Sequence, residues 1–246
     1  MKRIIGLLAM AALLFTPTVA FATGQTGFYV TPKFVYGFTQ MNGMRAQGDD
    51  GSASARIGNK SDNAWGGALA VGYDFNMRCG YPVRAELEYA VFSNVSGQRT
   101  WYGLVDEDDE TSNARLKQRL QVQTLFVNAY HDFHNDTPFT PWLGAGLGMA
   151  FINSKGSGKV WEQSDGEEDV TLSYGAKLNT NFAWNVGAGV AYAVNEAISV
   201  DLGYRFAGLG KARTKWRVDV DGDRDSRLRT KNVYQHQLML GLRFSF

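Results

Sequence analysis

The C-terminal segment of the chain, from Val233 to Phe246, alternates between two kinds of residue. Every second position is large or apolar, and these positions are Tyr234, His236, Leu238, Leu240, Leu242, Phe244 and Phe246. Most positions between them are polar or small. A repeat of two residues is the period of a β-strand, because successive side chains point to opposite faces. The segment therefore predicts a strand with one apolar and one polar face that runs to the last residue.

Seven further segments show the same alternation, so the sequence predicts eight strands. They run from Phe28 to Phe38, Trp65 to Phe75, Val83 to Val91, Leu120 to Tyr130, Phe139 to Phe151, Phe182 to Val194 and Ile198 to Phe206. Each has about 9 to 13 residues, close to the length with which a tilted strand crosses a bilayer. The segment from Leu120 is the least regular. Its residues Leu120, Val122, Phe126 and Tyr130 favour one face, but Thr124 and Asn128 interrupt that face.

The connections between these segments alternate in length. Those that follow Phe75, Tyr130 and Val194 are short, and the other four have roughly 25 residues each, a contrast typical of outer-membrane barrels. In lipid, only helices and closed barrels satisfy every backbone hydrogen bond. The sequence therefore predicts an all-β fold, an eight-stranded antiparallel up-and-down transmembrane β-barrel with short periplasmic turns and four long extracellular loops. A soluble β-sandwich would also alternate, but its connections would not be so regularly short and long.

The N-terminus has the pattern of an export signal. Lys2 and Arg3 precede an apolar run from Ile4 to Phe15, and Ala20-Phe21-Ala22 supplies a cleavage site. The run is too short for a spanning helix, which needs about 20 residues. We therefore expect a secretory signal peptide over residues 1–22, a barrel domain over residues 23–246, and localisation in the bacterial outer membrane.

Charge and cysteine content exclude several classes of protein. Basic residues number 25 and acidic residues 24, and removal of Lys2 and Arg3 with the signal peptide leaves 23 against 24, a net charge of −1. Such a balance argues against a nucleic-acid-binding protein. The single Cys79 allows no internal disulfide. No serine lies two residues from any of the three histidines, and no His/Cys cluster suggests a metal. We expect neither an enzyme nor a cofactor.

Two internal motifs and the terminal strand resemble a known family. The motifs are Asn128-Ala-Tyr-His-Asp-Phe133 and Pro141-Trp-Leu-Gly-Ala-Gly-Leu-Gly148. They resemble the opacity-protein and surface-antigen family of eight-stranded barrels, and the final Phe246 resembles the C-terminal signature of outer-membrane barrels. The resemblance implies a bacterial surface protein, often an adhesin or antigen. It also implies that the barrel-assembly machinery recognises a C-terminal signal made of Leu240, Leu242, Phe244 and Phe246.

Eight charged residues fall on the inward face of the predicted strands. They are Lys33, Asp74, Arg84, Glu86, Glu88, Asp201, Arg205 and Arg243. An eight-stranded barrel is just wide enough for side chains to fill its interior. The charges are therefore expected to pair across the lumen as an ionic plug. The alternative is a narrow polar conduit, which would make the protein a small-solute porin.

The predicted loops contain a second set of candidate residues. Acidic Asp106, Asp108 and Asp109 and the bulky or basic residues Trp101, Trp161, Trp216 and Arg217 fall in three of them. Tryptophan and arginine are common anchors of binding surfaces, although the tryptophans could equally form an aromatic girdle. We expect a monomeric outer-membrane surface protein that binds an unknown extracellular macromolecule in an adhesin-like or antigen-like way. Its other contacts would be with outer-membrane lipid and lipopolysaccharide.

Overall fold

The computed structural model describes residues 26–47, 54–105, 111–162, 170–218 and 224–246, and the side chains of most of these residues. Nine strand segments form one antiparallel sheet. They are β1 (Phe28–Gln47), β2 (Ser54–Asp74), β3 (Val83–Phe92), β4 (Val95–Val105), β5 (Thr111–Asp132), β6 (Phe139–Glu162), β7 (Val170–Ala193), β8 (Ile198–Val218) and β9 (Arg224–Ser245). A single helical turn, α2 (Asn76–Cys79), follows β2.

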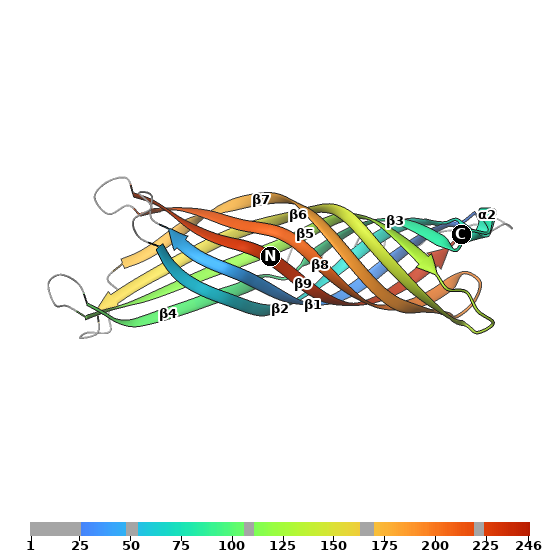
Figure 1. The fold of residues 1–246 in the computed structure, drawn as a ribbon, viewed down its shortest axis with the longest axis horizontal. Helices are drawn as coiled ribbons and strands as arrows, with labels where there is room; N and C mark the ends of the chain where they lie inside the picture. Colours follow the sequence, from blue (N-terminus) through green and yellow to red (C-terminus); the bar gives the residue numbers. More distant parts are fainter. Residues whose placement is uncertain (1–25, 48–53, 106–110, 163–169, 219–223) are drawn as a thin grey trace, which may run out of the picture.

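The sheet closes into a barrel of eight strands, because β3 and β4 are two parts of one strand. Both parts pair with β5, β3 through Leu87 opposite Val127 and β4 through Val95 opposite Leu120. The first and last strands also pair, with Phe34 opposite Leu240. Figure 1 shows the result as a long cylinder of tilted strands with α2 and the C-terminus at one end. The eight-stranded barrel that the sequence predicts is confirmed.

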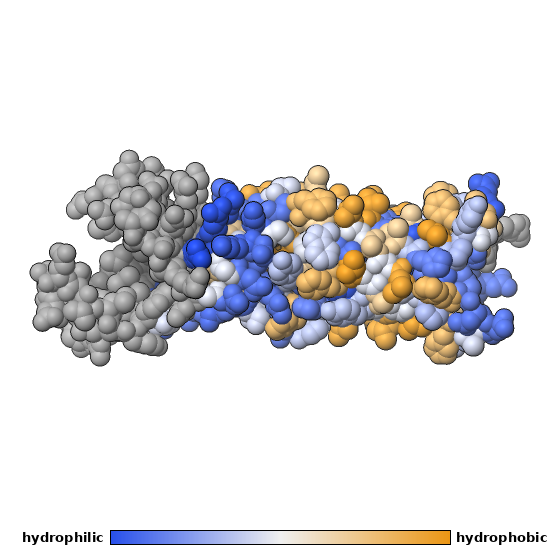
Figure 2. Space-filling model, in the orientation of Figure 1, coloured by the Kyte–Doolittle hydropathy of each residue, from blue (hydrophilic) through white to orange (hydrophobic). Residues whose placement is uncertain are grey.

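The part of the barrel next to α2, which we call the turn half, is apolar outside and polar inside. Leu69, Leu147 and Leu240 are more than half exposed on its outer surface. In Figure 2 apolar residues gather in a band across the visible face of this part of the molecule, with polar residues on both sides of them. Such a band is the lipid-facing surface of a membrane barrel. No helix in the described ranges is long and apolar enough to span a membrane.

The other part, which we call the extended half, has the opposite polarity. Its interior is mostly apolar, apart from the buried, hydrogen-bonded Gln118, Ser154 and Thr230, and its described outer surface is mostly polar. The core is formed chiefly by Met41, Met44, Phe92, Val95, Leu120, Val122, Ile152, Leu209 and Val233, each at most 2% exposed. This half is therefore built like a soluble β-protein, which buries its apolar side chains away from water. The change of polarity occurs within single strands, since β5 turns Leu125 outward and Leu120 inward.

The wall of the extended half consists of two sheets. In the described part of the chain, the ladder between β7 and β8 stops at Trp184 and Gly208, and no ladder joins β2 to β4. Side chains bridge the first gap. Asn181 Nδ2 donates to the backbone oxygen of Lys211 at 2.8 Å, and Asn179 Nδ2 donates to that of Arg213 at 2.9 Å. The sheets β8–β9–β1–β2 and β4–β5–β6–β7 thus face each other across the apolar core.

The strands are longer than the sequence alternation indicates. Most residues expected in long loops belong to ladders, since β1 runs to Gln47 and β2 resumes at Ser54. The unassigned face of the fourth predicted strand is also resolved. Leu120, Val122, Phe126 and Tyr130 face the interior together with Thr124 and Asn128, and Leu125 and Val127 face outward. The predicted signal peptide lies outside the described residues.

Candidate functional site

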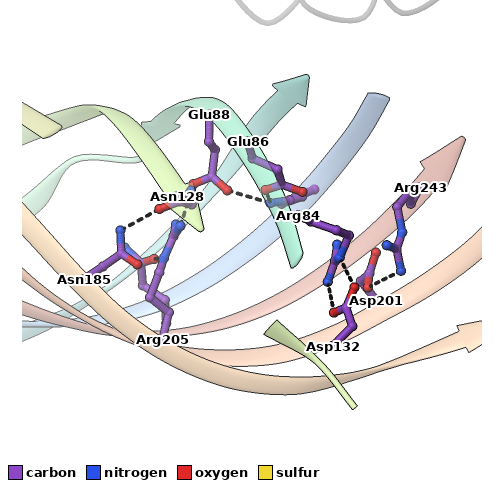
Figure 3. Close-up of polar contacts among 11 residues, drawn as sticks. Arg84, Glu86, Glu88, Asn128, Asp132, Asn185, Asp201, Arg205 and Arg243 are labelled. Carbon is purple, nitrogen blue, oxygen red and sulfur yellow. Dashed lines mark hydrogen bonds and ion pairs between the residues drawn. The ribbon is translucent and has the colours of Figure 1, made fainter. Parts of the chain in front are cut away.

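Two groups of ion pairs fill the lumen of the turn half. In the first group, Glu88 on β3 accepts hydrogen bonds from Lys33 Nζ at 2.7 Å and from Arg205 Nη1 at 2.6 Å. Lys33 also donates to Glu86 at 2.6 Å. These residues come from β1, β3 and β8, so the pairs tie distant walls of the barrel together (Figure 3). Arg205 Nε additionally donates to Gln237 Oε1 on β9 at 2.6 Å.

The second group lies nearer the turns. Arg84 donates to Asp132 through Nε and through Nη2, the latter at 2.9 Å. Arg243 donates to Asp201 at 3.3 Å. The ring of Tyr29 lies near both guanidinium groups, with its centroid 5.9 Å from that of Arg84 and 5.6 Å from that of Arg243. The bidentate pair of Arg84 with Asp132 is the strongest geometry available to such ions.

Small residues on β6 make room for these side chains. Gly146 faces the interior where Asn185 Nδ2 donates to Asn128 Oδ1 at 2.9 Å, and a methyl group at Gly146 would overlap both amides. Gly144 gives the same clearance to the ring of Tyr130. The pattern of alternating glycines on this strand therefore has a packing reason: side chains from the neighbouring strands β5 and β7 fill the space above them.

Most of the predicted lumenal residues are brought together. Seven of the eight take part in the ion pairs, Asp74 being the exception. Asp74 instead accepts a hydrogen bond from the backbone N–H of Asn76 at 2.8 Å, at the turn. Sequence reasoning missed Asp132, the partner of Arg84. It shares the inward face of β5 with Asn128 and Tyr130, a face that the alternation left unassigned.

Within the described part of the turn half, the ion-paired side chains enclose a small cavity. A cavity of about 20 Å³, room for a water molecule, lies among Lys33, Arg84, Glu86 and Asp201. The apolar core of the extended half adjoins this ionic layer along the same strands, where Phe126 and Val35 are fully buried. Side chains thus occlude the described lumen with an ionic layer followed by an apolar layer. No group of three or more His, Cys, Asp or Glu in the described ranges is arranged to hold a metal ion.

The candidate residues of the predicted loops are only partly placed. Asp106, Asp108 and Asp109 lie outside the described residues. Trp101 on β4 is opposite Ala114, and Trp161 on β6 is opposite the adjacent Asn113, so the two flank β5 near its start. Trp216 and Arg217 lie on β8 opposite Ser226 and Asp225. All four belong to strands of the extended half, and their side chains are outside the described part.

The C-terminal row is placed as the alternation predicts. Leu240, Leu242 and Phe244 are exposed on the lipid-facing surface. Phe246 is held by its backbone, since its N–H donates to Phe28 O at 2.9 Å and its carbonyl oxygen accepts from Thr26 Oγ1 at 2.7 Å. The role of this row as an assembly signal remains a prediction.

Comparisons with known proteins place the chain among bacterial outer-membrane proteins. It is 30% identical over 233 residues to the outer membrane protein PagN of Salmonella typhimurium, covering 92% of this chain and 93% of that one. It is 29% identical over 129 residues to "Putative adhesin RC1281" of Rickettsia conorii, covering 52% and 50%. Neisserial surface protein A, a solved structure, is 20% identical with a TM-score of 0.49, covering 91% of this chain and 99% of that one.

Outer-membrane barrels keep their short turns in the periplasm, so the turn half is the membrane and periplasmic part, and the extended half is extracellular.

A family model matches nearly the whole chain. The outer membrane protein beta-barrel domain matches residues 6–246, and the chain therefore belongs to this family of integral outer-membrane proteins.

Proposed function

We propose that this protein is an adhesin-type surface protein that binds an extracellular macromolecule with the outer end of its barrel. The observation that carries the proposal is the extended half. Its apolar core lets the ladder continue well past the lipid-facing band, to Gln47 on β1 and Val218 on β8. All the strand ends at this end of the barrel therefore lie away from the membrane, in one group (Figure 1).

The filled lumen supports binding over transport. A small-solute porin needs a continuous wet passage, and eight strands leave an interior that side chains can fill. Here the ion pairs of Glu88 and the apolar core around Leu120 both lie across that path. The name of the Rickettsia conorii relative agrees with adhesion, and the Salmonella typhimurium relative is named an outer membrane protein.

The test is adhesion of bacteria that display the protein. Residues 106–110 and 219–223 are replaced, together, by short Gly/Ser linkers, and residues 134–136 in a periplasmic turn are replaced in the control. We expect the first variant to lose adhesion to cultured cells and the control to retain it. Both should retain the heat-modifiable band of a folded barrel. Full adhesion by the first variant, or discrete conductance steps of the unmodified protein in a planar bilayer, would contradict the proposal.

A further inference from the structure

Five exposed basic residues gather on one wall of the extracellular half, and we name them the β8–β9–β1 cluster. They are Arg45, Lys211, Arg213, Arg229 and Lys231. The ladder places Arg213 opposite Arg229, and Arg229 opposite Arg45, so three arginines lie in one row across three strands. The side chain of Lys231 runs beside the row, because a methyl group at Gly43 on β1 would lie 3.2 Å from its Cδ.

No side chain that the structure describes neutralises this cluster. The described side chains of β8, β9 and β1 beyond the lipid-facing band include no carboxylate, and none of the five bases has a carboxylate partner among the described side chains. Like charges that lie directly opposite on neighbouring strands repel each other. Asn179 and Asn181 nevertheless hold the backbone of β8 at Lys211 and Arg213. A multivalent anion would relieve the repulsion between these arginines, whose positions the strands fix, so the row is suited to bind one.

The position of the cluster indicates which anion. Directly below it, the same three strands carry aromatic rings on the lipid-facing surface. Phe206 stacks on Tyr234 with centroids 5.6 Å apart, and His236 lies between Phe206 and Phe38. Such rings mark the membrane–water interface.

Lys231 precedes Tyr234 by three residues, and Arg229 by five. A strand tilted by about 40° climbs roughly 2.5 Å per residue along the barrel axis. By this spacing Lys231 lies about 7 Å above the rings, within the headgroup layer of roughly 5 to 8 Å that borders the hydrocarbon, and the arginine row lies about 12 Å above them, just beyond that layer.

We propose that the β8–β9–β1 cluster binds the phosphate groups of lipopolysaccharide in the outer leaflet. Lipopolysaccharide carries phosphates on its lipid anchor and inner-core sugars, at the level of the cluster, while its acyl chains cover the aromatic rings below. Arginine suits this ligand because its planar guanidinium binds phosphate oxygens in pairs. Continuity with the lipid-facing surface favours a lipid phosphate over a soluble polyanion. The site anchors one wall of the barrel to the surrounding lipid and is independent of adhesion.

The experiment is titration of the full-length folded barrel in detergent with fluorescently labelled lipopolysaccharide. In the test variant, Arg45→Gln, Arg213→Gln and Arg229→Gln are combined. Each basic residue near an anionic lipid surface strengthens binding about fivefold, so the loss of three should weaken binding about a hundredfold. The charge-matched control combines Lys117→Gln, Arg119→Gln and Lys155→Gln on the opposite wall. There Gln121 and Gln123 on β5 and Asn153 on β6 lie between the bases and the apolar band, and we expect less than a threefold change.

Three results would overturn the proposal. Equal losses in the two triple variants would mean that overall charge, not this cluster, attracts the lipid. Equal binding of enzymatically dephosphorylated lipopolysaccharide would exclude phosphate as the ligand. Heparin fragments that bind through the three arginines, without competition from lipopolysaccharide, would assign the cluster to a soluble sulfated polymer. If the triple glutamine variant does not fold, the single Arg229→Gln variant decides, with an expected loss of about fivefold.

Discussion

Removal of the Glu88 charge is the sharpest test of the ionic layer. Glu88 is fully buried and accepts hydrogen bonds from both Lys33 and Arg205. In Glu88→Gln the shape of the side chain is kept, but its one amide oxygen can accept from only one of the two cations, and the other cation faces the NH2 group. Lys33 retains its pair with Glu86, whereas Arg205 retains only the neutral Gln237. Leaving a buried charge without its partner costs about 3 to 5 kcal/mol, roughly two to three and a half orders of magnitude in the folding equilibrium.

The measurement is urea unfolding in lipid bilayers, followed by tryptophan fluorescence and the heat-modifiable band. The control is Asp136→Asn, the same chemical change at an exposed turn residue, which should alter the free energy of unfolding by less than about 0.5 kcal/mol. Replacing Arg205 by Gln in the Glu88→Gln background removes the unpaired cation and should restore more than about 1 kcal/mol. A Glu88→Gln variant within about 1 kcal/mol of the control would refute this account of the lumen.

Three further outcomes follow from the two halves of the barrel. Leu120→Ala should lower the free energy of unfolding by about 2 to 5 kcal/mol by leaving a cavity in the extracellular core, while Leu178→Ala, 62% exposed, should change it little in the same urea assay. Leu240→Arg should cost about 2 to 4 kcal/mol, because the charge faces lipid, and unimpaired assembly of this variant would contradict the register. Gly146→Ala should cost about 1 to 3 kcal/mol by separating the Asn128 amide from its partner, and an unchanged midpoint would show that β6 can shift.

Much of the fold could be predicted because alternation reports directly on shared faces. Arg84, Glu86 and Glu88 fall on one face of a strand whose other face carries Leu87 and Tyr89, and the structure places them inward together. A period of two does not, however, say on which side of the wall a face lies. Leu120 and Val122 are as apolar as the lipid-facing leucines, yet they point into the barrel because they lie beyond the membrane.

The same limit explains the missed and misplaced site residues. Asp132 shares its face with Tyr130 and with apolar Phe126, so its inward direction became clear only from the closed barrel. Asp74 has the phase of an inward residue, but it ends its strand, where the backbone N–H of Asn76 becomes available as a donor. Strand lengths were underestimated because polar outer surfaces beyond the membrane resemble loops in composition. The basic row of Arg213, Arg229 and Arg45 depends on register between three strands, which no single segment contains.

The reversed polarity of the extracellular half also bears on how firmly the protein stays in place. The polar outer surface around Met41, Leu120 and Ile152 cannot lie in lipid, so this core forms only after the strands have crossed the membrane. Once across, these side chains pack with one another, and the packing exists on one side of the membrane only. Withdrawal of the barrel toward the periplasm would first require that this core be unpacked in water. The extended half therefore opposes extraction of the barrel toward the periplasm, and the barrier to extraction grows with every side chain that its core buries.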